Sequence, residues 1–138
     1  MPLTYLLKQI QGALRAATEE ALAPIDITHA QASVLSVLST ASNLSNAELA
    51  RASFVTPQSM VELLRSLESQ GLLVRRPHPE GGRSMPAELT GAGREKLFQV
   101  FLAMRDVEER LLAGLPPEDR KRLRKSLEHC LAALRSAV

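Results

Sequence analysis

The sequence predicts a mainly α-helical fold that contains one β-hairpin, and three patterns support this prediction. Most of the chain repeats apolar residues at steps of three and four, as amphipathic helices do. Serine or threonine residues stand before several of these runs, where they can cap a helix N-terminus. Between residues 72 and 90, two short extended runs flank a loop rich in proline, glycine and arginine, as in a β-hairpin with a long tip.

The composition is typical of a globular protein and excludes several protein classes. The 138 residues, 45% of them apolar, suffice for one domain with its own core. No apolar run approaches the roughly 18 residues that span a bilayer, and the N-terminus lacks the pattern of a signal peptide. A single cysteine, Cys130, excludes an internal disulfide, and the three scattered histidines form no zinc-binding pattern. We therefore expect a cytoplasmic protein without a metal or other cofactor.

The net charge of +2 is small, but the basic residues are unevenly distributed. Residues 1–50 carry two more acidic than basic side chains, whereas residues 51–96 and 97–138 each carry two more basic than acidic ones. Because a nucleic-acid surface depends on where basic residues gather, the middle of the chain is the region to inspect.

The first third of the chain predicts three helices in succession. Residues 3–23 form an amphipathic helix that Pro24 ends, with an apolar face of Leu3, Leu6, Leu7, Ile10, Leu14, Ala17 and Ala21. Thr28 and Gln31 have the spacing of a capping box at the start of a second helix. Ser45 and Glu48 repeat this spacing before a short third helix.

A fourth helix, from Thr56 to about Gln70, has clear start and stop signals. Thr56 caps it, Pro57 occupies the first position where a missing N–H costs nothing, and Gly71 supplies a left-handed stop. Its apolar stripe consists of Met60, Leu63, Leu64 and Leu67. Its opposite face is polar and carries Gln58, Glu62, Arg65 and Ser69. With the short helix before it, this helix forms a helix-turn-helix pattern.

The hairpin that follows completes a winged helix. The runs LLVRRP and MPAELT flank the loop RRPHPEGGRSM, residues 75–85, which forms the tip of the wing. A long helix from Thr90 then carries Leu97, Phe101, Met104, Val107 and Leu111 on one side. After GLPPED, a last helix from Pro117 carries Leu123, Leu127, Leu131, Leu134 and Val138.

The first and last helices carry apolar stripes that a compact winged helix does not need. Unpaired, these stripes would expose several large aliphatic side chains, so we expect them to pair with a second copy of the chain. Folding back on the same subunit is the alternative. The expected dimerisation residues are Leu3, Leu6, Leu7, Ile10, Leu111, Leu123, Leu127, Leu131 and Leu134. The predicted fold class is therefore mainly α, a winged helix-turn-helix with a two-stranded β-hairpin wing and N- and C-terminal dimerisation helices.

The polar face of the fourth helix suits the reading of duplex DNA. Gln58 can pair with adenine through two hydrogen bonds, and Arg65 can pair with guanine or phosphate. The hydroxyls of Thr56 and Ser59, with the helix N-terminus at Pro57, can bind a phosphate. Glu62 would be repelled by phosphate, but it can accept from a cytosine amino group or hold Arg65 through an i, i+3 contact. A solvated helix surface is the alternative interpretation of this face.

The arginines of the wing strengthen the interpretation as a DNA-binding surface. Arg83, with Ser84 beside it, lies at the tip, where a guanidinium contributes little to folding but suits a narrow minor groove. Arg75 and Arg76 at the base are spaced to straddle phosphates. Solubility is the usual role of isolated surface arginines, but three in one wing after a recognition-type helix favour DNA.

The stretch LARASFVTPQSMVELLRSLESQGLLVRRPHPEGGRSMPAELTGAGREKL resembles the DNA-binding core of bacterial MarR-type transcriptional regulators. Two family motifs match, the first at Leu67, Glu68, Gly71, Leu72 and Leu73, the second at Leu89, Thr90 and Gly93. The resemblance covers essentially the whole chain. It implies one domain over residues 1–138, with a winged core at 28–89 and dimerisation helices at 1–23 and 90–138.

The resemblance also implies a partner and a switch. It implies a homodimer on a palindromic operator, with Arg83 as the wing-tip arginine. The family wing carries aspartates where this chain has His78 and Gly81, so we expect Arg83 to be mobile without DNA. Regulators of this type commonly release DNA when a small, often aromatic or anionic, ligand enters the crevice between the dimer helices and the winged domain. The candidate lining residues are Tyr5, Arg15, His29 and Phe54.

The predicted function is therefore that of a dimeric DNA-binding transcriptional regulator, a repressor. One alternative is a winged-helix module that binds protein, which Glu62 and the modest net charge favour. Another is an oxidation sensor at Cys130, although its apolar neighbours Leu127 and Leu131 predict a buried, inert thiol. We find no nucleophile elbow, metal-ligand cluster, phosphate-binding glycine loop or paired carboxylates, and so we do not expect an enzyme.

Overall fold

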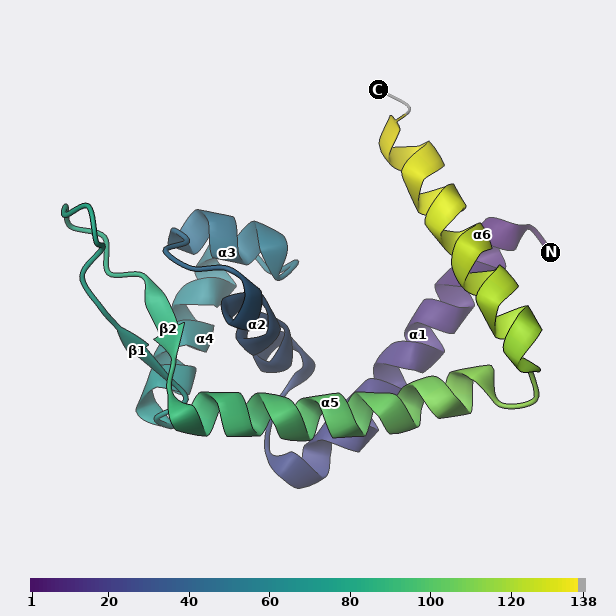
Figure 1. Cartoon of the computed structure of the whole chain (residues 1–138), viewed down its shortest axis with the longest axis horizontal. Helices are drawn as coiled ribbons and strands as arrows, with labels where there is room; N and C mark the ends of the chain where they lie inside the picture. The colour runs from purple at the N-terminus through teal and green to yellow at the C-terminus, as the bar shows by residue number, and fades with distance from the viewer. Residues whose placement is uncertain (137–138) are drawn as a thin grey trace. The chain divides into compact units, whose positions relative to one another are not determined.

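The computed structural model describes residues 1–136, and this part of the chain contains six α-helices, a 3₁₀ turn and a two-stranded sheet (Figure 1). The helices are α1 (Leu3–Leu22), α2 (His29–Thr40), α3 (Asn46–Ala52), α4 (Pro57–Ser69), α5 (Gly91–Leu112) and α6 (Pro117–Ser136), with the 3₁₀ turn at Ala23–Ile25. The strands are β1 (Leu73–Arg75) and β2 (Ala87–Leu89). The predicted mainly helical, winged architecture is confirmed. Val138, predicted for the last helix, lies outside the described residues.

The chain divides into two compact units, residues 1–107 and 108–138. The first contains α1 to α4, the wing and most of α5, and the second contains the end of α5 and α6. Among residues 1–136, no single helix combines the length and the apolar composition needed to cross a membrane. Only the segments Leu3–Ile25 and His29–Thr40, bent by 81°, meet both conditions as a pair.

The predicted helix starts are confirmed by side-chain hydrogen bonds. The Gln31 N–H donates to the Thr28 hydroxyl at 3.1 Å, and the Thr28 N–H donates to the Gln31 side chain at 3.0 Å. Ser45 and Glu48 form the same capping box at 3.1 and 2.9 Å. The donation from the Ser45 N–H, helped by the Ser45 hydroxyl, lowers the pKa of the Glu48 carboxyl below its ordinary value of 4.5.

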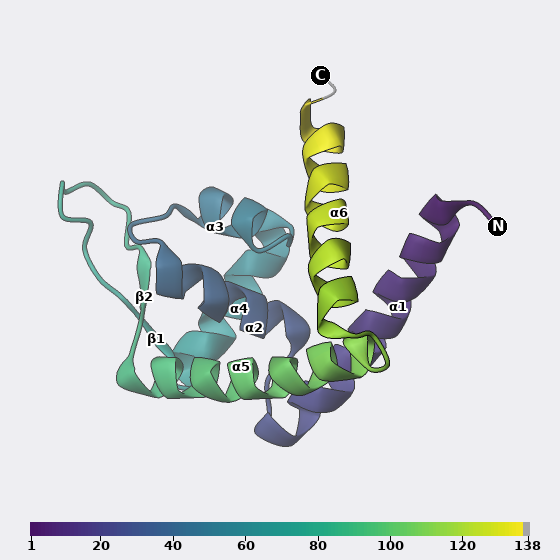
Figure 2. The ribbon, with the colours of Figure 1, turned by 45° about the vertical axis from the view of Figure 1, so that its right-hand side comes forward.

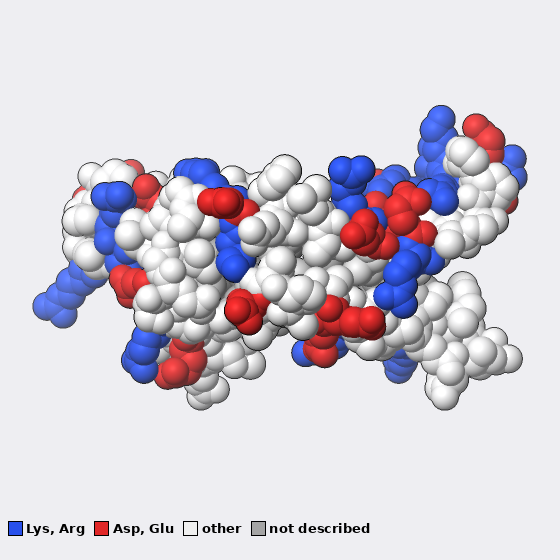
Figure 3. Space-filling model, turned by 90° about the horizontal axis from the view of Figure 1, so that it is seen from below, with Lys and Arg blue, Asp and Glu red and all other residues white. Residues whose placement is uncertain are grey.

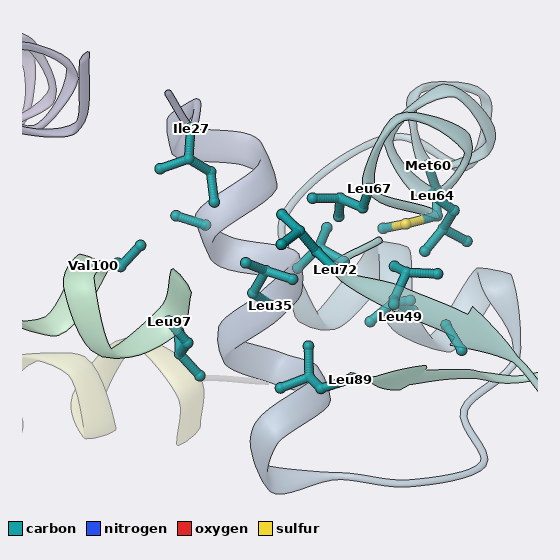
Figure 4. Packing of buried hydrophobic residues seen from close by; sticks show 14 of the residues in the cluster. Ile27, Leu35, Leu49, Met60, Leu64, Leu67, Leu72, Leu89, Leu97 and Val100 are labelled. Atoms are coloured by element: carbon teal, nitrogen blue, oxygen red, sulfur yellow. The ribbon is translucent and has the colours of Figure 1, made fainter. Parts of the chain in front are cut away.

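The core lies where α2, α3, α4 and the wing meet, and its side chains point toward one another (Figure 4). Met60, Leu64 and Leu67 of the predicted α4 stripe are buried and Leu63 is half-buried, so the stripe is confirmed. Further buried members from other elements are Leu35, Leu49, Leu72, Leu89, Leu97 and Val100.

The face predicted for the long helix α5 is only partly buried within the chain. Leu97 and Val107 are buried and Met104 is half-buried, but Phe101 and Leu111 are exposed within the chain. Val100, which the prediction omitted, is buried instead. Positions 97, 100, 104, 107 and 111 follow the three- and four-residue steps of one helix face, and position 101 lies to the side of it. Leu111 is on this face but belongs to the second compact unit, outside the core.

The wing is joined to α5 through Thr90 and Gly93. The strands pair antiparallel with Leu73 opposite Leu89. The Thr90 hydroxyl donates to the Gly71 carbonyl at 2.6 Å and accepts from the Gly93 N–H at 3.0 Å, while the Thr90 N–H donates to the Leu72 carbonyl at 3.2 Å. Gly93 lies so close to the chain at Leu72 that a β-carbon would overlap the Leu72 carbonyl oxygen. A glycine is therefore required where α5 meets the wing.

Candidate nucleic-acid interface

Helix α4 presents a polar face that its buried stripe holds in place. Gln58, Ser59, Glu62 and Arg65 are exposed, while Met60 on the opposite side is fully buried. In both views of the ribbon α4 lies against α2 and α3, which contact it (Figures 1 and 2). The helix therefore has a fixed orientation, and its outer face is open to a partner.

The N-terminus of α4 gathers hydroxyl groups at the surface. The Thr56 hydroxyl accepts from the Ser59 N–H at 3.1 Å and donates to the Ser59 hydroxyl at 2.9 Å. Pro57, in the first turn, has no N–H of its own. Because the first N–H groups of a helix lack intrahelical acceptors, this exposed end can bind an anion such as a phosphate.

Glu62 and Arg65 form an ion pair on the same face. The Arg65 Nη1 donates to the Glu62 Oε1 at 3.2 Å, and both side chains are largely exposed. The i, i+3 contact that the sequence allowed is thus present. It offsets the negative charge of Glu62 on this face and orients the guanidinium of Arg65.

Both arginines at the base of the wing have partners within the wing itself. Arg75 Nη1 donates to the Met85 carbonyl at 3.0 Å, and Arg76 Nε pairs with Glu88 at 3.2 Å. Each bond joins the two sides of the hairpin, a bracing role that the sequence reasoning missed. The strand pairing could have revealed it, since the register places Glu88 diagonal to Arg76.

The tip of the wing is held by His78. Its Nδ1 accepts from the Glu80 N–H at 3.1 Å, and its carbonyl accepts from the Gly81 N–H at 2.9 Å. His78 stands where the family wing carries an aspartate, and its Nδ1 takes the acceptor position that an aspartate carboxylate has in an Asx turn. Gly81 and Gly82 adopt φ of 86° and 94°, which glycine adopts without strain.

Arg83 and Ser84 are exposed at the end of this turn. Within residues 1–136, the Arg83 side chain makes no hydrogen bond or ion pair. The tip extends away from the helices in both views of the ribbon (Figures 1 and 2). Elsewhere, Lys and Arg side chains alternate with Asp and Glu on the face shown in Figure 3. Over the described residues, this face therefore carries no broad basic surface.

A cleft of about 530 Å³ lies between the end of α1 and the start of α2. Its lining includes Arg15 and His29, two of the predicted ligand residues, and Arg15 Nε pairs with Glu19 at 3.2 Å. The other two do not line it. Tyr5 is exposed near the start of α1, and Phe54 is exposed in the turn between α3 and α4.

The terminal helices leave their apolar faces uncovered within the chain. All nine predicted dimerisation residues are exposed, and no residue of α6, over Pro117–Ser136, is buried. A second cleft, of about 520 Å³, follows this face between the end of α5 and α6 and is lined by Leu111, Leu123 and Leu127 among others. The prediction that Cys130 is buried is wrong for the single chain, because α6 packs none of its described side chains into a core.

Comparison with known proteins agrees with this geometry. The model of the MarR family matches residues 25–84. The chain is 38% identical over 127 residues to the HTH-type transcriptional repressor Rv2887 of Mycobacterium tuberculosis, covering 92% of this chain and 91% of that protein. The chain belongs to the MarR family of winged helix-turn-helix transcriptional regulators, as the sequence motifs predicted. It is a regulator, not an enzyme.

Solved structures extend the likeness to the whole fold. The structure of Rv2887 in complex with DNA has a TM-score of 0.83 at 35% identity, covering 94% of this chain and 98% of that one. Rv2887 in complex with salicylic acid has a TM-score of 0.80 at 37% identity, covering 94% and 96%. The apo form of MarR from E. coli has a TM-score of 0.84 at 26% identity, covering 95% and 98%.

Proposed function

We propose that this chain is a homodimeric bacterial repressor that binds a palindromic operator in the cytoplasm and releases it when a small aromatic acid binds. The observation that carries the proposal is the exposed polar face of α4 together with a wing-tip guanidinium that has no partner within residues 1–136, on a fold shared with a repressor solved in complex with DNA. A recognition helix and a wing of this kind can occupy the major groove and the adjacent minor groove together.

The DNA contacts divide into two kinds. Gln58 and Arg65 face the base edges, where an amide suits adenine and a guanidinium suits guanine, and Glu62 orients Arg65. Thr56, Ser59 and the first turn of α4, which begins at Pro57, bind phosphate and set the register. At the wing, Arg83 enters the minor groove and Ser84 lies at its edge. Arg75 and Arg76 act by bracing the hairpin, and their charges strengthen the field around it.

The exposed apolar face of the terminal helices supports dimerisation. Fully burying one large aliphatic side chain is worth about 1.5–3 kcal/mol, so leaving the eight leucines and Ile10 of this face in water would be costly. A second copy would cover them and set two copies of α4 about one helical turn apart on a two-fold symmetric site. The wing and the helix caps of a single chain form without this apolar face, so a second copy of the chain is the reason for it.

The cleft between α1 and α2 supports a ligand switch. Its volume of about 530 Å³ is in the range of small-molecule sites. A ligand carboxylate can replace Glu19 as the partner of Arg15, which is an exchange of like groups. Rv2887, with a similar fold, was solved in complex with salicylic acid and with p-aminosalicylic acid.

The cleft is linked to the recognition helix through the cap of α2. Thr28 lines the cleft and caps α2, and Gln31 of the same cap donates to Ser66 of α4 at 3.1 Å. Ligand binding can therefore bias the position of the recognition helix.

The test is a titration of labelled duplex with protein, followed by fluorescence anisotropy at several salt concentrations. The duplex is the sequence that the wild-type protein selects from a random pool. Arg83→Ala should weaken binding by at least about tenfold, the loss expected for a charged hydrogen bond, and reduce the salt dependence. Arg105→Ala, an exposed arginine on α5, is the control and should bind normally. Equal affinity of Arg83→Ala and wild type would remove the wing from the mechanism.

The switch is tested on the same complex with sodium salicylate as the probe. Salicylate should release the wild-type protein from the selected duplex, and Arg15→Gln should require a much higher concentration. Lys8→Gln, on the same helix but outside the cleft, is the control. If Arg15→Gln responds as wild type does, the aromatic acid binds elsewhere.

A further inference from the structure

The ends of α3 and α4 are built in the same way but carry different residues. At the end of α4, the Leu72 N–H donates to the Leu67 carbonyl at 3.0 Å and the Gly71 N–H donates to the Glu68 carbonyl at 3.0 Å. This is the Schellman motif, in which the residue after the cap takes a left-handed conformation. Gly71 has a φ of 76°, as the motif requires.

At the end of α3 the left-handed position is occupied by Phe54. The Val55 N–H donates to the Ala50 carbonyl at 3.0 Å, and the Phe54 N–H donates to the Arg51 carbonyl at 3.3 Å, which repeats the motif. Phe54 has a φ of 57°, a conformation that is costly for a residue with a large side chain and free of strain for glycine. The end of α3 therefore has a strained phenylalanine at the position where the end of α4 has a glycine.

The fold gains nothing visible from the Phe54 ring. The residue is 91% exposed, and it lines neither of the two clefts described above. All four aromatic residues of the chain are at least half exposed, so each lies on a surface rather than in the core. Tyr5, Phe98 and Phe101 lie on α1 and α5, which carry other exposed apolar residues. Phe54 is the aromatic residue of the helix-turn-helix, and its exposed ring is free to contact a partner of that surface.

The stretch of sequence around Phe54 lacks acidic residues and is bounded by Glu48 and Glu62. Residues 49–61 contain one arginine, Arg51, and no acidic residue. Phe54 stands two residues before Thr56, so their backbones are at most about 7 Å apart. Phe54 therefore lies close to the first turn of α4, the part of a recognition helix that meets base edges in the major groove. The apolar group that the major groove offers is the C5-methyl of thymine.

We propose that Phe54 is a specificity-determining residue whose ring packs against a thymine methyl group of the operator, beside the first turn of α4. This inference rests on the proposed function as a DNA-binding repressor. Contact with one buried methyl group is worth about fourfold in affinity per half-site, and so about fifteenfold for a two-fold symmetric site.

The test is a uracil scan of the duplex that the wild-type protein selects from a random pool. Each thymine is replaced in turn by uracil, symmetrically in both half-sites, which removes one methyl group and leaves base pairing unchanged. The wild type should lose about fifteenfold at one symmetric pair of positions. Phe54→Gly should bind the thymine duplex about fifteenfold more weakly and should show no thymine preference at that pair. Phe54→Leu, which keeps an apolar side chain, should retain part of the preference.

Stability separates this effect from misfolding. Phe54→Gly relieves the left-handed strain, so its thermal midpoint should equal or exceed that of the wild type while its operator affinity falls. Equal affinity of Phe54→Gly and wild type, or identical uracil scans, would overturn the role of Phe54 and leave the proposed function intact. A wild-type protein that selects no duplex from the pool would overturn the proposed function and this inference with it.

Discussion

Replacing Gly93 by alanine tests how α5 is joined to the wing. In the structure a β-carbon at this position overlaps the Leu72 carbonyl oxygen, meets the Leu72 carbonyl carbon at 3.1 Å and meets Leu89 Cδ2 at 3.2 Å. The oxygen belongs to the backbone and cannot rotate away as a side chain would. The start of α5 must therefore move away from the end of α4, and the hydrogen bonds between them must stretch.

Two hydrogen bonds depend on this close approach. They join the Thr90 N–H to the Leu72 carbonyl and the Thr90 hydroxyl to the Gly71 carbonyl. Each contributes about 1 kcal/mol net, so losing both costs about 2 kcal/mol. Alanine regains at most about 1 kcal/mol over glycine through its helix propensity. The free energy of unfolding should therefore fall by about 1 kcal/mol, which lowers Tm by about 3–5 °C for a chain of this length.

The assay is thermal unfolding followed by circular dichroism at one fixed protein concentration, because dimerisation makes Tm concentration-dependent. Gly91→Ala is the matched control, since it lies in the same first turn of α5 and a β-carbon there meets nothing within 4 Å. Its Tm should stay the same or rise slightly. If Gly93→Ala melts no lower than Gly91→Ala, the close approach at Leu72 does not limit stability and the reasoning is refuted.

Three further predictions concern single side chains. The pKa of the Glu48 carboxyl is lowered, so the stability that this carboxylate contributes is complete above pH 4.5 and is lost as the pH falls through the lowered pKa. In acid denaturation, the difference in stability between wild type and Glu48→Gln should therefore shrink below pH 4.5. A constant difference would contradict the capping role. Lys96→Met removes the 2.7 Å hydrogen bond from Nζ to the Ile25 carbonyl and should cost about 1–2 kcal/mol in urea unfolding, whereas an unchanged midpoint would show that the bond is dispensable. His78→Ala removes the acceptor for the Glu80 N–H at the wing tip, so operator affinity should fall about threefold to tenfold with an unchanged Tm. Full affinity of this variant would mean that the turn needs no side-chain acceptor.

The starts and ends of the helices could be predicted from the sequence because they depend on neighbours within four residues. Thr28, Ser45 and Thr56 cap their helices with partners three positions along the chain, and Gly71 ends α4 in a conformation that glycine favours. The stripe of α4 follows from helix periodicity alone. The family motifs then supplied the order of the elements, which the structure confirms.

The tertiary structure decided what each exposed or charged side chain contacts, because such partners lie far apart in the sequence. Arg75 and Arg76 brace the hairpin, and which face of α5 is buried depends on the elements packed against it. Phe54 appeared in the sequence as a candidate ligand residue, and its strained, exposed position became visible once its backbone and its surroundings were known. Local periodicity and capping determine the elements, whereas long-range packing determines which of their side chains remain free to bind a partner.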